Sequence, residues 1–261
     1  EGELADMNNQ LDQALAGVTS SLGDMLKAQL DRDVTATSYN TLGVALYRAQ
    51  IARDAALKVL EQSQTAVVLN KDIDSSAAKP LGISANQLNI NGTLNTDLYL
   101  KSDSNLGLGN IAVASGKVID AYAANNIGVV GNVSSDKSIT LNARGDIVGQ
   151  GGKLISPLVS LIAGRSIGGD VDANPLTDNT VFTQTSTLAA QAADGGAYIS
   201  NANGGALLTI GTAGAVSGVT AADSITLATD GDLAVDEAIA GGNKTTDTVR
   251  LVSGGAITNG Q

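Results

Sequence analysis

Apolar and small residues alternate with polar ones in short stretches that recur about every twenty residues along the last two thirds of the chain. This alternation predicts strands with one buried face, and the recurrence is typical of one coil of a parallel β-helix. We expect roughly eight stacked coils. Their inward positions are Leu98, Leu100, Ser102; Ile119, Ala121, Ala123; Ile139, Leu141, Ala143; Val159, Leu161, Ala163; Ser186, Leu188, Ala190; Leu208, Ile210, Thr212; Ile225, Leu227, Thr229; and Val249, Leu251, Ser253.

A short turn follows most of these strands and leads to a second apolar residue. The turns carry Gly, Asp, Asn or Ser, as in LNARGDI (141–147) and LATDGDL (227–233). These residues tolerate the bent backbone of a coil corner. A single coil cannot bury its apolar face, so stacking on its neighbours must do so. The sequence therefore predicts a β-helix over residues 84–261.

The first part of the chain has helical periodicity instead. Apolar residues recur at three- and four-residue spacing over residues 3–30 and again over 38–64, where Ser38 is placed to cap the second helix. We expect an α-helical hairpin within residues 1–65 that serves as a spacer, an end cap or an assembly contact.

Two further segments break the strand pattern. Residues 66–83 contain Pro80 and Gly82 and are predicted to link the hairpin to the β-helix. Residues 168–184 interrupt the coil spacing, contain Phe182 and are predicted to form a loop insertion, a frequent place for recognition. An elongated coil without a partner explains the second segment equally well.

Composition and charge narrow the range of functions. The formal charge is −11 and no basic stripe is present, so we expect no nucleic-acid partner. Apolar runs are interrupted by Gly, Ser or Asn, so we expect no membrane insertion in this segment. Aromatic residues are only 2%, which suits a narrow core of stacked aliphatic side chains.

Candidate chemistry is sparse because the chain has no His and no Cys. The usual general base, thiol nucleophile and zinc ligands are missing, so we expect no enzyme activity and no cofactor. A polysaccharide-acting β-helix enzyme using Asp residues is the weaker alternative, and the densest acidic neighbourhood includes Asp136 and Asp146. A calcium site is a candidate in the loop insertion, at Asp170, Asp172 and Asp178. Solvated turn and loop carboxylates are the alternative explanation.

The coil sequences resemble the repeats of filamentous-haemagglutinin-like exoproteins, the large bacterial adhesins exported by two-partner secretion. The resemblance covers about residues 84–261 and is carried by LNARGDIVGQGG, LIAGRSIGG, LLTIGTAGAVSG, SITLATDGDLAV and VRLVSGGAITNG. It implies a right-handed parallel β-helix, a secreted or cell-surface location, and a role in adhesion, aggregation or display of a distal domain. The family's secretion domain is not recognisable here, and the helical hairpin is not part of its usual plan.

Arg144, Gly145 and Asp146 spell the tripeptide of integrin recognition, and some members of the resembling family carry a similar one. Gly145 also falls where Gly231 falls in a later repeat, and Asp146 where Asp232 falls. The tripeptide is therefore either a binding motif or an ordinary coil turn.

We expect a rigid stalk segment of an extracellular adhesin, with a self-assembling filament or surface-layer subunit as the alternative. The expected partners are further domains of the same long chain, other copies of the chain, or a receptor on a host or neighbouring cell. The chain opens at Glu1 without a signal peptide and stops just after a coil turn, so we expect either an internal piece of a longer protein or a subunit whose open end a neighbour covers.

Overall fold

The computed structural model describes residues 10, 12–22, 66–69, 73, 75–169, 179–242 and 244–260. The chain divides into two compact units, Glu1–Gln64 and Thr65–Gln261. Residues 12–22 of the first unit form an α-helix, within the range predicted for the first helix. Leu15, Val18 and Leu22 are exposed on it. The predicted second helix, 38–64, and the closing of the hairpin lie outside the described residues.

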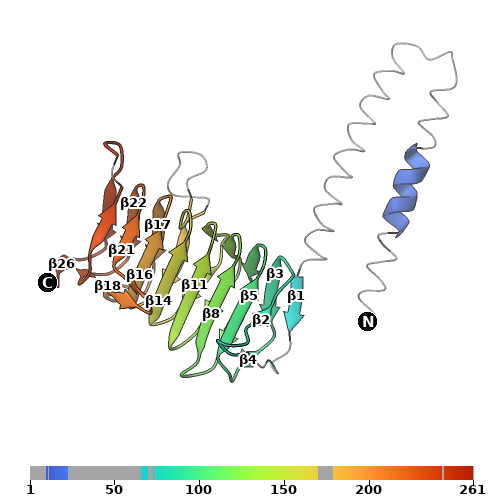
Figure 1. Cartoon of the computed structure of the whole chain (residues 1–261), viewed down its shortest axis with the longest axis horizontal. Coiled ribbons are helices and arrows are strands. Elements are labelled where there is room, and N and C mark those ends of the chain that lie inside the picture. Colours follow the sequence, from blue (N-terminus) through green and yellow to red (C-terminus); the bar gives the residue numbers. More distant parts are fainter. Residues whose placement is uncertain are drawn as a thin grey trace, which may run out of the picture. The chain divides into compact units, whose positions relative to one another are not determined.

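The second unit is a parallel β-solenoid of about eight turns, as predicted (Figure 1). Its coils build three sheets. The five-stranded sheet contains β1 (Ala66–Leu69), β3 (Gln87–Ile90), β6 (Leu106–Leu108), β9 (Ile127–Val129) and β12 (Ile147–Gly149). The eight-stranded sheet contains β4 (Thr93–Leu94), β7 (Ile111–Val113), β10 (Val133–Ser134), β13 (Lys153–Ile155), β15 (Val181–Gln184), β17 (Ala197–Asn201), β22 (Ile225–Thr229) and β25 (Val249–Ser253).

The eleven-stranded sheet is the longest. It contains β2 (Leu81–Gly82), β5 (Leu98–Ser102), β8 (Val118–Ala123), β11 (Ser138–Ala143), β14 (Leu158–Ala163), β16 (Thr187–Ala192), β18 (Leu208–Ile210), β21 (Val219–Ala221), β23 (Leu233–Val235), β24 (Ile239–Gly241) and β26 (Ile257–Asn259). A small antiparallel hairpin, β19 (Thr212–Ala213) and β20 (Val216–Ser217), leaves this sheet between β18 and β21.

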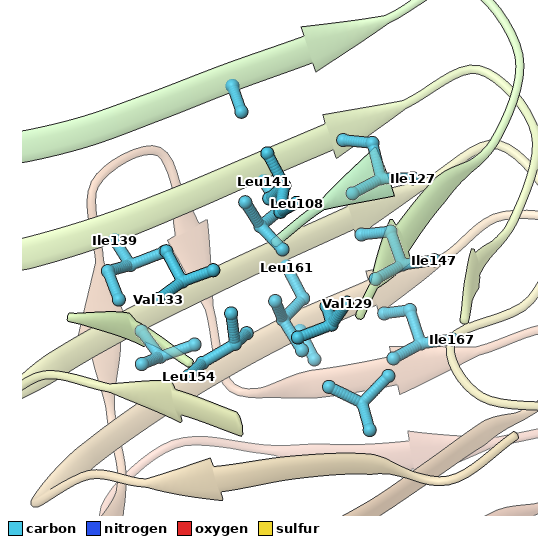
Figure 2. Close-up of a cluster of buried hydrophobic side chains, with 14 of the residues drawn as sticks. Leu108, Ile127, Val129, Val133, Ile139, Leu141, Ile147, Leu154, Leu161 and Ile167 are labelled. Atoms are coloured by element: carbon cyan, nitrogen blue, oxygen red, sulfur yellow. The ribbon is translucent and has the colours of Figure 1, made fainter. Parts of the chain in front are cut away.

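The register of the first four predicted rungs is confirmed. Ile139 pairs with Ile119 on one side and with Val159 on the other, and Leu98 pairs with Ile119. These side chains are fully buried, because alternate residues of each strand point to the inside of the solenoid. Figure 2 shows Leu141 and Leu161 stacked in this core.

The later rungs differ from the prediction in two ways. Val159 pairs with Leu188, so Ser186 is not an inward residue and is exposed. Ile225 pairs with Ala197 in the eight-stranded sheet, whereas Leu208 pairs with Leu233. The prediction placed the inward residues of all eight coils in one ladder of paired strands, and this was wrong for the later coils. Strands of all three sheets share the same alternation, so alternation alone does not show to which sheet a strand belongs.

The predicted linker and loop insertion both contain strands. Residues 66–83 were predicted to be a linker, but β1 pairs in parallel with β3, and β2 pairs with β5. Residues 168–184 were predicted to be a loop, but β15 pairs with β13 and β17. Residues 170–178 lie outside the described residues. The regular structure thus extends further along the chain than its alternation suggests.

Aliphatic side chains alone make up the hydrophobic core of the described solenoid. The buried apolar residues are Leu, Ile, Val and Ala. The described aromatic residues, Tyr99, Tyr122, Phe182 and Tyr198, alternate with buried residues and occupy outward positions. A coil cross-section closed by three short strands leaves room for stacked aliphatic chains, which accounts for this separation.

The β19–β20 hairpin covers part of the outer face of the eleven-stranded sheet. Its Ala213 and Val216 form a second apolar cluster with Ala189, against which Leu158 and Ile162 pack. Ala189 is fully buried although it points outward from β16. The chain re-enters the sheet through Gly218, whose φ is +72°.

Candidate functional site

The Arg144–Gly145–Asp146 turn joins β11 to β12. Oδ1 of Asp146 accepts a hydrogen bond of 3.0 Å from the backbone N–H of Ser166, one coil further along. Oδ2 of Asp146 pairs with the guanidinium of Arg165 at 2.5 Å. Both carboxylate oxygens are therefore engaged by the next coil.

Asp146 belongs to a ladder of side chains that ties successive corners together. Oδ1 of Asn105 accepts from the N–H of Asn126 at 3.1 Å, and Oδ1 of Asn126 accepts from the N–H of Asp146 at 2.8 Å. A Cβ added to Gly145 would lie 2.1 Å from Oδ1 of Asn126. The Gly and the Asp of the tripeptide thus have structural reasons to be present, and the integrin interpretation stays a prediction.

The predicted calcium ligands Asp170, Asp172 and Asp178 lie outside the described residues. Within the part of the chain that the structure describes, no three or more His, Cys, Asp or Glu residues are grouped so that they could hold a metal ion. Asp136 and Asp146 lie at opposite ends of β11. Asp136 precedes the strand and Asp146 follows it, so the full length of β11 separates the two carboxylates and they do not form a catalytic pair.

A groove of about 280 Å³ lies at the corner where coils pass from the eight-stranded to the eleven-stranded sheet. It is lined by Ser135, Asp136, Ile155, Ser156, Pro157, Gln184, Thr185, Ser186 and Asn203. Hydrogen bonds from the Ser115 side chain and from the N–H of Gly116 lower the pKa of Asp136. A carboxylate held in its ionised form is suited to accepting hydrogen bonds, whereas a general acid needs a raised pKa.

Three hydroxyl residues follow one another along this groove, one per coil. Ser135 donates to the carbonyl of Lys117 at 2.6 Å, and Thr185 donates to the carbonyl of Pro157 at 3.0 Å. Ser156 lies between them, and its buried Oγ has no hydrogen-bond partner. Two of the three hydroxyls thus join successive coils, so the floor of the groove is structural.

Sequence reasoning missed a cluster on the outer face of the eleven-stranded sheet. Tyr99 pairs directly with Asp120, and Tyr122 follows two residues later on the same face of β8. The signal was available, because residues between the inward positions of a predicted rung must point outward.

The comparisons with known proteins add no family. No family model, no curated protein and no solved structure matches the chain. The resemblance to filamentous-haemagglutinin-like repeats therefore stays a prediction. None of the helical residues described in the structure belongs to a helix long and apolar enough to cross a bilayer.

Proposed function

We propose that the solenoid is a stiff, non-enzymatic spacer in an extracellular adhesive protein. The observation that carries this proposal is a single aliphatic core that runs from Ile83 to Leu233 through successive coils. Parallel pairing joins successive coils in the eight-stranded and eleven-stranded sheets along the solenoid, and in the five-stranded sheet from β1 to β12. Bending or extending such a rod requires many hydrogen bonds and apolar contacts to break together.

Side-chain ladders support the same role. The Asn105, Asn126 and Asp146 ladder adds one hydrogen bond per coil at a corner. A second ladder joins Asn89 to the N–H of Asn110, and Asn110 to the N–H of Asn132. These corners resist shear between coils, which suits a part that transmits force.

The extracellular location in this proposal rests on the resemblance of the repeats to secreted adhesins. The adhesive contact would involve residues at the surface of the rod, with the turn at Arg144 and the sequence around residues 168–184 as the candidates. A receptor on a host or neighbouring cell is the partner that such a role requires.

Single-molecule stretching of the full chain between a surface and a cantilever tests the spacer role. We expect the solenoid to stay folded until a high force and then to lengthen in steps that correspond to one or a few coils. In the same measurement, the Leu141→Asp variant should lengthen at a lower force than the unaltered chain. Extension of the unaltered chain at low force, without steps, would contradict the proposal.

A self-assembling filament or surface-layer subunit is the second candidate. The observation that favours it is the exposure of two large apolar side chains before the last coil, Phe182 at 37% and Leu207 at 49%. Light scattering across a concentration series, with Leu207→Lys as the comparison, separates the two candidates. Growth that the substitution abolishes supports assembly, whereas a constant monomer mass supports the spacer.

A further inference from the structure

An unusual group of side chains lies on the outer face of the early coils, on the strands β5, β8 and β11. The outward positions of β5, β8 and β11 there hold two aromatic rings, one carboxylate, one ammonium group and two neutral polar groups. We call these residues the Asp120 patch: Tyr99, Lys101, Asp120, Tyr122, Thr140 and Asn142.

The two tyrosines flank the carboxylate. Tyr99 is the direct cross-strand neighbour of Asp120, at a strand spacing of about 4.8 Å, and Tyr122 is two residues further along the same strand. All three side chains are partly buried. The core of the solenoid contains no aromatic residue, so the two rings beside this acidic group belong to its outer surface.

Asp120 lacks a partner within this surface. No hydrogen bond or ion pair joins its carboxylate to any residue that the structure describes. Desolvation by burial raises its pKa. A partly buried carboxylate without a donor is destabilising, and a bound group that brings donors would relieve this penalty.

The one cation of the patch is directed elsewhere. Nζ of Lys101 lies 3.8 Å from Oδ1 of Asp103, and both side chains are largely exposed. On the third strand of the patch, Thr140 and Asn142 are neutral. Asp120 therefore remains available to an external cation.

A guanidinium group matches this arrangement best. It supplies paired N–H donors to a carboxylate, and its flat face stacks on a tyrosine ring. The net charge of −11 also favours approach of a basic partner.

We propose that the Asp120 patch docks a basic segment of a partner protein, with an arginine side chain paired to Asp120 and stacked against Tyr99 and Tyr122. This surface does not depend on the spacer role. It assigns a binding function to the side of the rod, whereas the spacer role concerns its length.

Tyrosine ring NMR signals of the full chain provide the test, with the peptide acetyl-Gly-Gly-Arg-Gly-Gly-amide as the probe at pH 7. We expect the signals of Tyr99 and Tyr122 to shift with a dissociation constant on the order of millimolar, because one charge-assisted contact is weak. The citrulline peptide, which has the same shape without the charge, should leave them in place.

Two variants make the test specific. Asp120→Asn should weaken binding of the arginine peptide by about tenfold. Asp103→Asn, which removes an exposed carboxylate beside the patch, should change binding by less than about twofold. Both positions point outward, so the midpoint of thermal unfolding serves as a check that each variant is folded.

The outcomes that would overturn the proposal are distinct. Equal binding of the arginine and citrulline peptides would show that binding does not depend on the positive charge. Unchanged binding to the Asp120→Asn variant would remove the carboxylate from the site. Shifts of the two tyrosines with N-acetylglucosamine but not with the arginine peptide would assign the patch to saccharides instead.

Discussion

The early coils of the solenoid are regular, whereas the later coils are interrupted. From β5 to β14 each strand of the eleven-stranded sheet pairs with one strand of the next coil. From β16 onward two short strands, β18 and β21, together replace one long strand. Leu188 pairs with Ile210, and Ala190 pairs with Val219, so the eight residues 211–218 lie between two neighbours in the ladder.

This difference shows which feature the fold requires. Ile210 and Val219 are both fully buried, so the inward ladder continues across the interruption. The intervening residues leave the sheet as the β19–β20 hairpin and cover its outer face. The solenoid thus tolerates insertion in the middle of a strand provided that the core stack is unbroken.

The largest expected effect compares the middle of the stack with its last coil. Leu141→Ala removes a fully buried side chain of the regular coils and should lower the free energy of unfolding by about 2–5 kcal/mol. Leu251→Ala in the partly buried last coil should have a clearly smaller effect. Hydrogen exchange, read separately for each coil, measures both. Equal effects at the two positions would mean that the stack does not become weaker toward β25.

A second comparison concerns the glycines at turns. Gly218→Ala should destabilise the interrupted region by about 1–3 kcal/mol, because φ is +72° and the new Cβ would lie 2.1 Å from the carbonyl oxygen of Ala238. Gly116 also has positive φ, +76°, but its surroundings are open, so Gly116→Ala should have a smaller effect. Chemical denaturation of the two variants measures both losses of stability. A larger loss for Gly116→Ala than for Gly218→Ala would contradict this prediction.

A third comparison separates structure from recognition at the tripeptide turn. Asp146→Ala removes a carboxylate that joins two coils and should lower stability by about 1 kcal/mol. Arg144→Ala changes an exposed side chain and should leave stability within about 0.5 kcal/mol. An integrin role requires both variants to lose cell attachment. Attachment that survives Arg144→Ala would leave the turn with its structural role alone.

The smallest expected effect is the pH response of Asp120. Burial raises its pKa in the folded chain, so the charged form is penalised above that pKa and the protonated form is not. Asp120→Asn should therefore increase stability at pH 7. The gain should shrink as the pH falls through the folded pKa and vanish below the ordinary value of about 3.9. Thermal unfolding of both proteins between pH 3 and pH 7 measures it, and a gain that is constant with pH would contradict this explanation.

Much of the fold could be read from the alternation of residues. Ile119, Ile139 and Val159 were placed on one inward ladder, and their pairing is confirmed. Ser186 was placed on the same ladder and is exposed, because the chain between β14 and β16 is longer and the alternation does not record a shift of two residues. Residues 66–69 carry too short an apolar run to reveal that they pair with β3.

The candidate sites were less predictable for a related reason. The tripeptide at Arg144 is visible in the sequence, but its hydrogen bonds reach residues one coil away in each direction. The Asp120 patch joins residues about twenty positions apart, and its burial depends on side chains of neighbouring coils.

The sequence by itself determined the class of this protein: short alternating strands, glycine-rich corners and an aliphatic core that only stacked coils can bury. The tertiary structure decided which strand belongs to which sheet, how the β19–β20 hairpin covers β16, and which outward residues become neighbours. The physical reason is that alternation is a local property of each strand. Register and face depend on the length of chain between strands and on how side chains of different coils fill the same space.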